Sequence, residues 1–135
     1  MSIFDQLKNG IETNSGEETQ AVAAEFARNL PPDVTIAFSG DLGVGKTTFI
    51  QGMAATWNIP DPVTSPSFNL YNIYRGENRL LVHLDAYRIV QPEQFDSLMI
   101  EDFLESPYCL AVEWPENAAG WLPADAIWLT LSIVK

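Results

Sequence analysis

Apolar residues along the chain alternate between helical spacing and strand spacing. Near the start, Ser15 and Glu18 form a capping box, and Val22, Phe26 and Leu30 follow on one helical face. Prolines come directly after this face and cannot continue a helix. The pattern therefore predicts a helix that opens after Ser15 and ends at Leu30.

The middle of the chain has the pattern of one strand, one helix and a hairpin. Residues 34–38 are a β-branched, apolar run typical of a buried strand, and the proline-free segment 47–57 carries apolar residues at helical spacing. Two further apolar runs, 68–74 and 79–84, are separated by a connection of hairpin length. We therefore predict that these two strands are antiparallel neighbours.

The last third of the chain predicts another helix and two more strands. Pro92 is favoured at a first helical position, and apolar residues recur at helical spacing after it as far as Phe103. A third apolar strand, a loop or broken helix, and a closing strand with alternating apolar residues follow at 108–112, 116–125 and 127–133.

A glycine-rich segment between the first strand and its helix has phosphate-binding spacing. Gly40 is followed, after four residues, by Gly45, Lys46 and Thr47, which is the P-loop pattern. Glycines let backbone N–H groups approach phosphate oxygens, Lys46 supplies a positive charge for them, and the Thr47 hydroxyl can ligate Mg²⁺. A helix N-terminus adds a preference for anions. The predicted nucleotide-binding segment comprises Gly40, Asp41, Leu42, Gly43, Val44, Gly45, Lys46, Thr47 and Thr48.

These elements together predict the fold class. We expect a single α/β domain of the P-loop NTPase type over residues 1–135, with a mixed central sheet, an antiparallel hairpin and helices on both faces. The chain is long enough to bury a substantial core. Residues 1–10 carry no regular pattern, and we treat them as a candidate disordered segment.

Two of the predicted strands end in a carboxylate. Asp85 follows an apolar strand as a Walker B acid does, and Glu113 follows the next one. At the carboxyl edge of a sheet both would face the metal of a bound nucleotide. A turn aspartate and a solvated glutamate are the ordinary alternatives, and only the P-loop favours the metal interpretation. His83, the sole histidine, is expected to be a hydrogen-bonded group in the core or behind the site rather than a catalyst.

The loop before the hairpin is rich in hydroxyls. Thr64, Ser65 and Ser67 surround Pro66, and their hydroxyls suit either of two roles. They can donate to a phosphate or ligate a metal through water, or they can cap the turn itself. The residues alone leave both open.

Composition limits the partners and the compartment. The net charge is −11 with seven basic residues, so a free-standing nucleic-acid binder is disfavoured. An acidic surface that meets a basic protein and a charge that serves solubility both remain open. No signal peptide or membrane span of about 20 apolar residues is visible, which favours the cytoplasm. Cys109 lies in an apolar run and is expected in the core, as are the tryptophans, except that Trp114 adjoins Glu113.

A magnesium–nucleotide site leaves three functional classes. A GTPase switch would show Asn-Lys-x-Asp and Asp-x-x-Gly, and neither pattern occurs. A small-molecule kinase usually has several lid arginines, whereas only Arg88 lies beside a motif here. A regulatory ATPase needs only the loop, a metal, a carboxylate and a partner that senses its state. Elimination favours the third class.

Four sequence blocks resemble one family. The loop at 40–48, Val-Thr-Ser-Pro-Ser-Phe at 63–68, His-Leu-Asp-Ala-Tyr-Arg at 83–88 and Glu-Trp-Pro at 113–115 resemble the TsaE (YjeE) family in order and spacing. The resemblance spans roughly residues 12–131. It implies a P-loop ATPase that acts with TsaB and TsaD in forming threonylcarbamoyladenosine in tRNA, with ATP turnover resetting the complex and tRNA reached only through the partners. The oligomeric state stays open.

The resemblance also implies residue roles. Lys46 and Thr48 would hold phosphates, Thr47 and Glu113 would ligate Mg²⁺, and Asp85 would act on the metal or on water. A switch-like loop of Thr64, Ser65 and Ser67 would lie near the γ-phosphate, and Trp114 would lie close to the nucleotide. The implied catalytic residues are Lys46, Asp85 and Glu113; the implied metal ligands are Thr47, Asp85 and Glu113; the implied cofactors are ATP and Mg²⁺.

The chain departs from the family pattern in two places. Ser67 stands where threonine is usual, which keeps the hydroxyl, and the sequence stops at Lys135, where relatives usually continue through another strand or two. The last sheet edge is therefore the least certain part of the expected fold. A P-loop kinase of a small metabolite or nucleoside is the runner-up, and a nucleotide-gated binding module without turnover is the third possibility.

Overall fold

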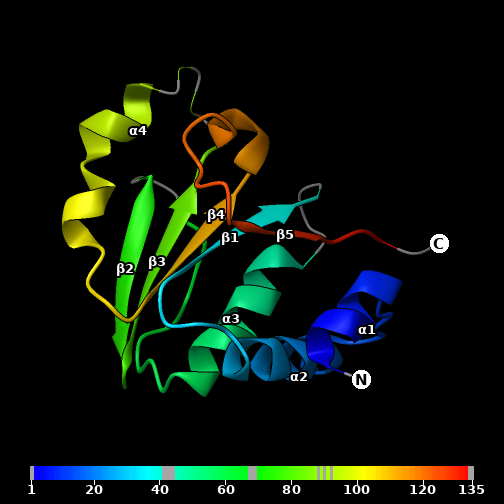
Figure 1. The fold of residues 1–135 in the computed structure, drawn as a ribbon. Coiled ribbons are helices and arrows are strands. Elements are labelled where there is room, and N and C mark those ends of the chain that lie inside the picture. The colour runs from blue at the N-terminus through cyan, green and yellow to red at the C-terminus, as the bar shows by residue number, and fades with distance from the viewer. Residues whose placement is uncertain are drawn as a thin grey trace.

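The computed structural model describes residues 2–40, 45–66, 70–87, 89, 91 and 93–133. Five strands of the described residues form one sheet in the order β2-β3-β4-β1-β5 (Figure 1). All neighbouring strands are parallel except β2 and β3, which are antiparallel. The mixed sheet with its antiparallel hairpin is therefore confirmed. The strands are β1 (Val34–Ser39), β2 (Tyr71–Gly76), β3 (Arg79–Asp85), β4 (Tyr108–Glu113) and β5 (Ile127–Thr130).

Helices cover both faces of the sheet, as the sequence predicted. On one face lie α2 (Gly16–Arg28) and α3 (Lys46–Thr56), with α1 (Ile3–Asn9) against α2. The opposite face is covered by α4 (Glu93–Leu98) and by 3₁₀ turns at Ile100–Phe103 and Pro115–Ala118 (Figure 1). Because β1, β3 and β4 are buried on both faces, they read as nearly continuous apolar runs rather than as alternating ones.

A row of edge-to-face aromatic contacts joins α1, α2 and α3 to the sheet. The rings of Phe4, Phe26, Phe49 and Phe38 follow one another with centroids 5.7 Å apart at each step. The row runs from α1 through α2 and α3 to β1, and such pairs add stability beyond the area that they bury. It fixes α3, which begins at Lys46, against the sheet.

Several sequence predictions need correction. The candidate disordered segment at 1–10 contains α1, which Ser2 caps through a 3.1 Å bond from the Asp5 N–H. The helix expected as far as Phe103 is broken at Met99, whose φ of 54° is left-handed and ends regular helix geometry. The described part of that helix starts at Glu93, and Pro92 lies outside the described residues.

The ends of other elements also shift. The helix expected to reach Leu30 ends at Arg28, and the closing strand ends at Thr130. The Ser15 cap and the bond from the Glu18 N–H are present as predicted. Trp128 was expected in the core, but it lies on an edge strand and is 51% exposed because nothing in the described residues covers that side.

Cys109 is buried in the core between the sheet and helices α2 and α3, as the sequence predicted. Burial raises the pKa of its thiol to about 12, because a thiolate would lose its hydration there. The thiol therefore stays protonated and packs as a small apolar group. Among the helices of the described residues, none is long and apolar enough to cross a bilayer.

The contact between α2 and α3 depends on Gly52. A Cβ at this position would lie 2.7 Å from both the Cα and the carbonyl oxygen of Gln20, and 2.9 Å from the Cβ of Ala23. Backbone atoms cannot move aside as a flexible side chain can. The two helices therefore approach as closely as they do only because residue 52 has no side chain.

We predict that Gly52→Ala lowers the free energy of unfolding by about 1–3 kcal/mol, since overpacking the helix contact outweighs the better helix propensity of alanine. Gly16→Ala is the matched control, because a Cβ there meets the Thr48 methyl at an ordinary 3.7 Å. Chemical denaturation of both variants measures the difference. Equal stability of the two variants would show that α2 can move away without cost.

Candidate nucleotide site

The predicted phosphate loop connects β1 to α3. Gly40 and Gly45 both have positive φ, of 133° and 96°, which suits glycine and disfavours other residues. Lys46 is the first residue of α3, so free N–H groups at the helix start face the loop. Asp41, Leu42, Gly43 and Val44, which the sequence placed in the binding segment, lie outside the described residues.

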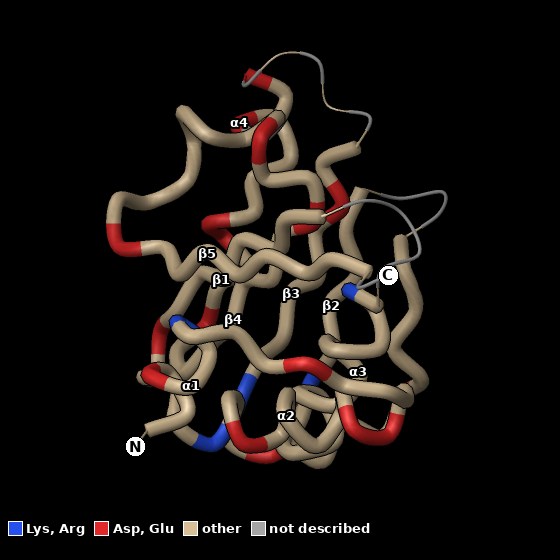
Figure 2. The backbone as a smooth tube through the Cα atoms, turned by 90° about the vertical axis from the view of Figure 1, so that its right-hand side faces the viewer, with Lys and Arg blue, Asp and Glu red and all other residues tan. Residues whose placement is uncertain are grey.

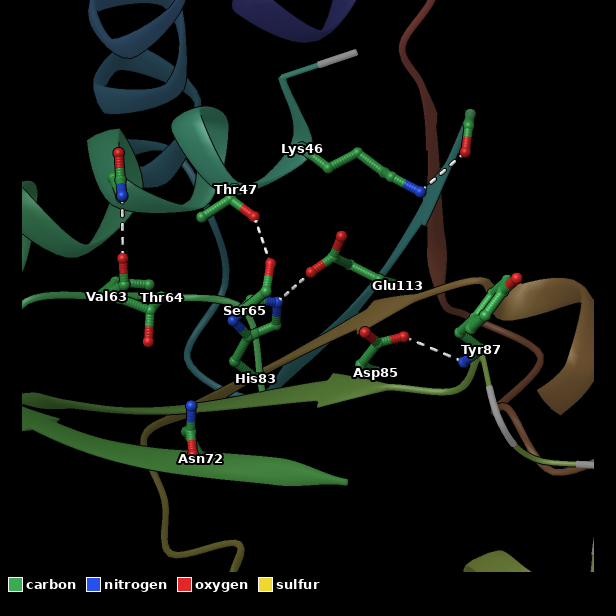
Figure 3. A network of polar contacts seen from close by, with 12 residues as sticks. Lys46, Thr47, Val63, Thr64, Ser65, Asn72, His83, Asp85, Tyr87 and Glu113 are labelled. Atoms are coloured by element: carbon green, nitrogen blue, oxygen red, sulfur yellow. Dashed lines mark hydrogen bonds and ion pairs between the residues drawn. The ribbon is translucent and has the colours of Figure 1, made fainter. Parts of the chain in front are cut away.

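Lys46 is buried, with only 4% of its surface exposed. Its ammonium donates a 2.7 Å hydrogen bond to the Gly40 carbonyl, drawn as the dashed line from Lys46 in Figure 3. It also lies 4.3 Å from the centre of the Trp114 ring. The Tyr87 ring packs on Trp114 with centroids 5.0 Å apart. The structure thus brings Trp114 against the predicted phosphate-binding lysine, and a carbonyl and an aromatic face compensate the buried charge.

The hydroxyl-rich loop that carries Thr64 and Ser65, called the hydroxyl loop below, lies over the start of α3. The hydroxyls of Thr47 and Ser65 are 2.7 Å apart, so Ser65 bonds to the predicted phosphate loop (Figure 3). This contact favours a role at the site over a turn that caps itself with that hydroxyl. Ser67 lies outside the described residues, and the Thr64 side chain is exposed. Thr48 is half-buried in the first turn of α3, with its methyl group toward Gly16.

Two side chains that the sequence did not single out hold the hydroxyl loop. Gln51 of α3 donates a 2.9 Å bond to the Val63 carbonyl. The Tyr74 hydroxyl lies 3.3 Å from the Thr64 N–H and 3.4 Å from its carbonyl oxygen. Helical spacing placed Gln51 on α3 but gave no sign of this contact, because it depends on how the loop folds back.

The two strand-end carboxylates are neighbours, as the sequence predicted. Asp85 of β3 is paired in register with Glu113 of β4, at the same edge as the end of β1. An Asp85 oxygen accepts a 3.0 Å bond from the Tyr87 N–H, which is a turn contact. Burial raises the pKa of Asp85, and the nearby Glu113 carboxylate acts in the same direction.

The effects that lower the pKa of Asp85 are smaller than those that raise it. The Tyr87 N–H stabilises the carboxylate, and the charges of His83 and Lys46 also lower its pKa, but the direction remains upward. Asn117 braces the turn that follows Asp85 by donating to the carbonyls of Ala86 and Tyr87 at 2.9 and 3.3 Å. The sequence gave no signal for Asn117, which lies in the segment interpreted as loop or broken helix.

Glu113 is 6% exposed and His83 is fully buried. The Nε2 atom of His83 lies 2.5 Å from a Glu113 oxygen, and the second oxygen points away from the ring (Figure 3). The sequence expected His83 to be hydrogen-bonded in the core or behind the site, and the structure confirms that placement.

The donor set fits Mg²⁺ rather than a transition metal. In the described part of the chain, no three His, Cys, Asp or Glu side chains form a metal cluster. Mg²⁺ is normally held by one or two carboxylates together with phosphate oxygens and water. The Thr47 hydroxyl, Asp85 and Glu113 supply hard oxygen donors around one space (Figure 3).

A groove of about 1190 Å³ lies between α1, residues 10–15, α2 and β5. Ser15 and Thr19 are on its wall, together with Phe49 of α3 and Leu129 of β5. Gly16, next to Ser15, faces the Thr48 methyl group in the first turn of α3. The groove therefore reaches the neighbourhood of the phosphate loop and is lined partly by apolar side chains.

Comparison with known proteins finds a matching family. A family described as "Threonylcarbamoyl adenosine biosynthesis protein TsaE" matches residues 13–135. The tRNA threonylcarbamoyladenosine biosynthesis protein TsaE of Rickettsia bellii is 34% identical over 122 residues, covering 90% of this chain and 84% of that protein. Its namesake from Borreliella burgdorferi is 32% identical over 126 residues, covering 92% and 91%.

A solved structure shows the same fold. The crystal structure of Bacillus subtilis YdiB superposes with a TM-score of 0.67 at 30% identity, covering 87% of this chain and 72% of that one. The fold, the four sequence blocks and the family match point to the same conclusion. This chain belongs to the TsaE family of threonylcarbamoyladenosine biosynthesis proteins.

Proposed function

We propose that this chain binds and hydrolyses Mg·ATP, and that turnover resets a complex with TsaB and TsaD between cycles of threonylcarbamoyladenosine formation in tRNA. The observation that carries the proposal is the convergence of Lys46, the Thr47–Ser65 hydroxyl pair and the two carboxylates at one edge of the sheet. This combination supplies a positive charge for phosphates and oxygen ligands for a metal in one place.

The phosphates would occupy the start of α3. The loop from Gly40 to Gly45 and the helix N–H groups would surround the β-phosphate, and Lys46 would leave the Gly40 carbonyl to reach the β- and γ-phosphates. Thr48, in the same turn, would add a hydroxyl. Thr64, Ser65 and Ser67 would lie toward the γ-phosphate, with Ser65 the member that already contacts the loop.

The metal would lie between the hydroxyl and the carboxylates. Thr47 and Glu113 would hold Mg²⁺, which supplies charge neutralisation at the phosphates, and Asp85 would ligate it or orient the attacking water. The raised pKa of Asp85 reflects a carboxylate that lacks its full hydration. A bound cation would compensate that loss.

The nucleoside would lie in the groove beside Ser15. Its volume of about 1190 Å³ exceeds what a nucleoside needs, and its apolar walls suit a base while Ser15 and Thr19 offer hydroxyls. Trp114 would stay close to the phosphates rather than the base, because it packs on Lys46.

The surface charge supports action through protein partners. Figure 2 shows acidic positions spread over much of the trace and few basic ones, and the net charge is −11. Such a surface repels a phosphate backbone, so contact with tRNA would occur through TsaB and TsaD. Those partners would sense the nucleotide state rather than receive a phosphoryl group.

Magnesium-dependent ATP hydrolysis by the purified chain, alone and with the TsaB–TsaD pair, tests the proposal. We expect weak activity alone and a clear rise with the pair, with phosphate released to water. Activity that the pair does not change would contradict the coupling. Transfer of labelled phosphate to a metabolite would instead identify a kinase, and binding without turnover under either condition would contradict hydrolysis.

Removal of the Lys46 charge is expected to abolish hydrolysis without unfolding the chain. Lys46→Ala and the better packed Lys46→Met should each lower the rate about 100-fold or more, since the charge acts on the transition state. Arg28→Met is the control, because Arg28 is an exposed cation at the end of α2. Phosphate release and circular dichroism are the measurements, and near-normal turnover in Lys46→Met would remove Lys46 from the site.

Glu113→Gln is expected to weaken nucleotide binding only when magnesium is present. The Mg²⁺ concentration needed for half-maximal ATP binding should rise about 10-fold or more, because a ligand is lost while the side-chain volume is kept. Glu116→Gln, an exposed acid that bonds to Ser39, makes the same change in charge and should have little effect. A fluorescent ATP analogue with and without EDTA measures both, and equal losses in the two conditions would exclude the ligand role.

A further inference from the structure

His83 is a buried histidine with one partnered and one unpartnered ring nitrogen. It is the sole histidine of the chain and has no exposed surface. Its Nε2 atom lies 2.5 Å from an oxygen of Glu113, whereas Nδ1 has no hydrogen-bond partner among the described residues. Buried polar atoms are normally paired, so an unpaired nitrogen next to a candidate metal ligand needs an explanation.

Strand register explains how the ring reaches Glu113. His83 of β3 is directly opposite Ala111 of β4, and Glu113 is two residues further along the same face. The small Ala111 side chain leaves room for the ring to lie along the strand toward this diagonal neighbour. Diagonal pairs on one face are within reach of aromatic side chains.

The short contact fixes which ring nitrogen donates to Glu113. A nitrogen 2.5 Å from a carboxylate oxygen must carry the hydrogen, because two lone pairs would repel each other at that distance. The geometry therefore makes Nε2 the donor and the Glu113 oxygen the acceptor.

We propose that His83 is a positioning residue that fixes Glu113 for the metal, an inference that rests on the proposed function. The Nε2–H bond ties one Glu113 oxygen and leaves the other pointing away from the ring, toward the space shared with Lys46 and Thr47 (Figure 3). A carboxylate held this way loses no rotamer freedom when the metal arrives. His83 itself has no exposed surface and does not touch the nucleotide.

The first test is a nitrogen spectrum of the ring in the chain without nucleotide or metal. Because His83 is the sole histidine, long-range ¹H–¹⁵N correlations of the imidazole come from one residue. We expect hydrogen on Nε2, and a changed Nε2 shift in Glu113→Gln. A ring with no hydrogen on Nε2, or an Nε2 shift that Glu113→Gln leaves unchanged, would overturn the proposal.

The second test separates positioning from folding. His83→Leu should raise the Mg²⁺ concentration for half-maximal ATP binding about 10-fold to 100-fold, and His83→Gln, whose amide can donate from nearly the same position as Nε2, should restore most of it. Binding in EDTA should stay within about twofold of the unmodified chain in both variants. An equal loss with and without magnesium, or no rescue by glutamine, would show a structural role only.

Leu81→Ala is the matched control. Leu81 comes two residues before His83 on the same buried face of β3 and lies in the core between the sheet and helices α2 and α3. It should lower stability without a selective change in magnesium dependence, and a selective change would count against the proposal. The proposed function and the positioning role of His83 can be contradicted independently of each other. An unmodified chain that binds no ATP removes the proposed function, whereas the ring spectrum still decides whether His83 holds Glu113.

Discussion

The site depends on two opposite charges that are buried at the end of the central strands. Lys46 and Glu113 are 4% and 6% exposed, and a charge removed from water is costly unless partners compensate it. The Gly40 carbonyl and the Trp114 ring compensate Lys46, and the His83 ring compensates Glu113. Each charge therefore has its own partners, and among the described residues no hydrogen bond or ion pair joins the two directly.

This arrangement keeps both groups available. A direct Lys46–Glu113 ion pair would neutralise the cation that phosphates need and the anion that a metal needs. A carbonyl and an aromatic face hold an ammonium less strongly than a carboxylate does, so an arriving phosphate can replace them. The same reasoning applies to Glu113, whose bond to the His83 ring uses one carboxylate oxygen and leaves the other pointing away from the ring.

The fold and much of the site follow from patterns that are local in sequence. Apolar runs gave the strands, the Ser15 capping box gave α2, and the Gly40 to Thr47 spacing gave the loop. The break at Met99 and the helix at Ile3–Asn9 were missed, because each depends on tertiary packing more than on propensity. The Ser2 cap with Asp5 three residues on was the one signal for α1, and it is weak in so short a segment.

Contacts across strands and loops could not be predicted. The His83–Glu113 bond needs the register of β3 against β4, and a shift by one residue would place His83 on the opposite face. The sequence could not separate a phosphate- or metal-binding role of the hydroxyl loop from a turn that caps itself, because both use the same residue types. The Ser65–Thr47 contact, which depends on the path of the loop, favours a role at the site.

The adjacency of Asp85 and Glu113 is the strongest physical argument for a divalent cation. Residues paired in register on one face have their Cβ atoms only about 5 Å apart, and like charges in that position destabilise a sheet. Burial raises the pKa of Asp85 by removing its hydration, and the Glu113 carboxylate raises it further. The Tyr87 N–H and the His83 ring, which contact one carboxylate each, orient the two groups without removing their charge. A cation bound between the remaining oxygens would relieve the charge repulsion and compensate the lost hydration. The free energy that these two effects cost the chain without metal would therefore contribute to metal binding.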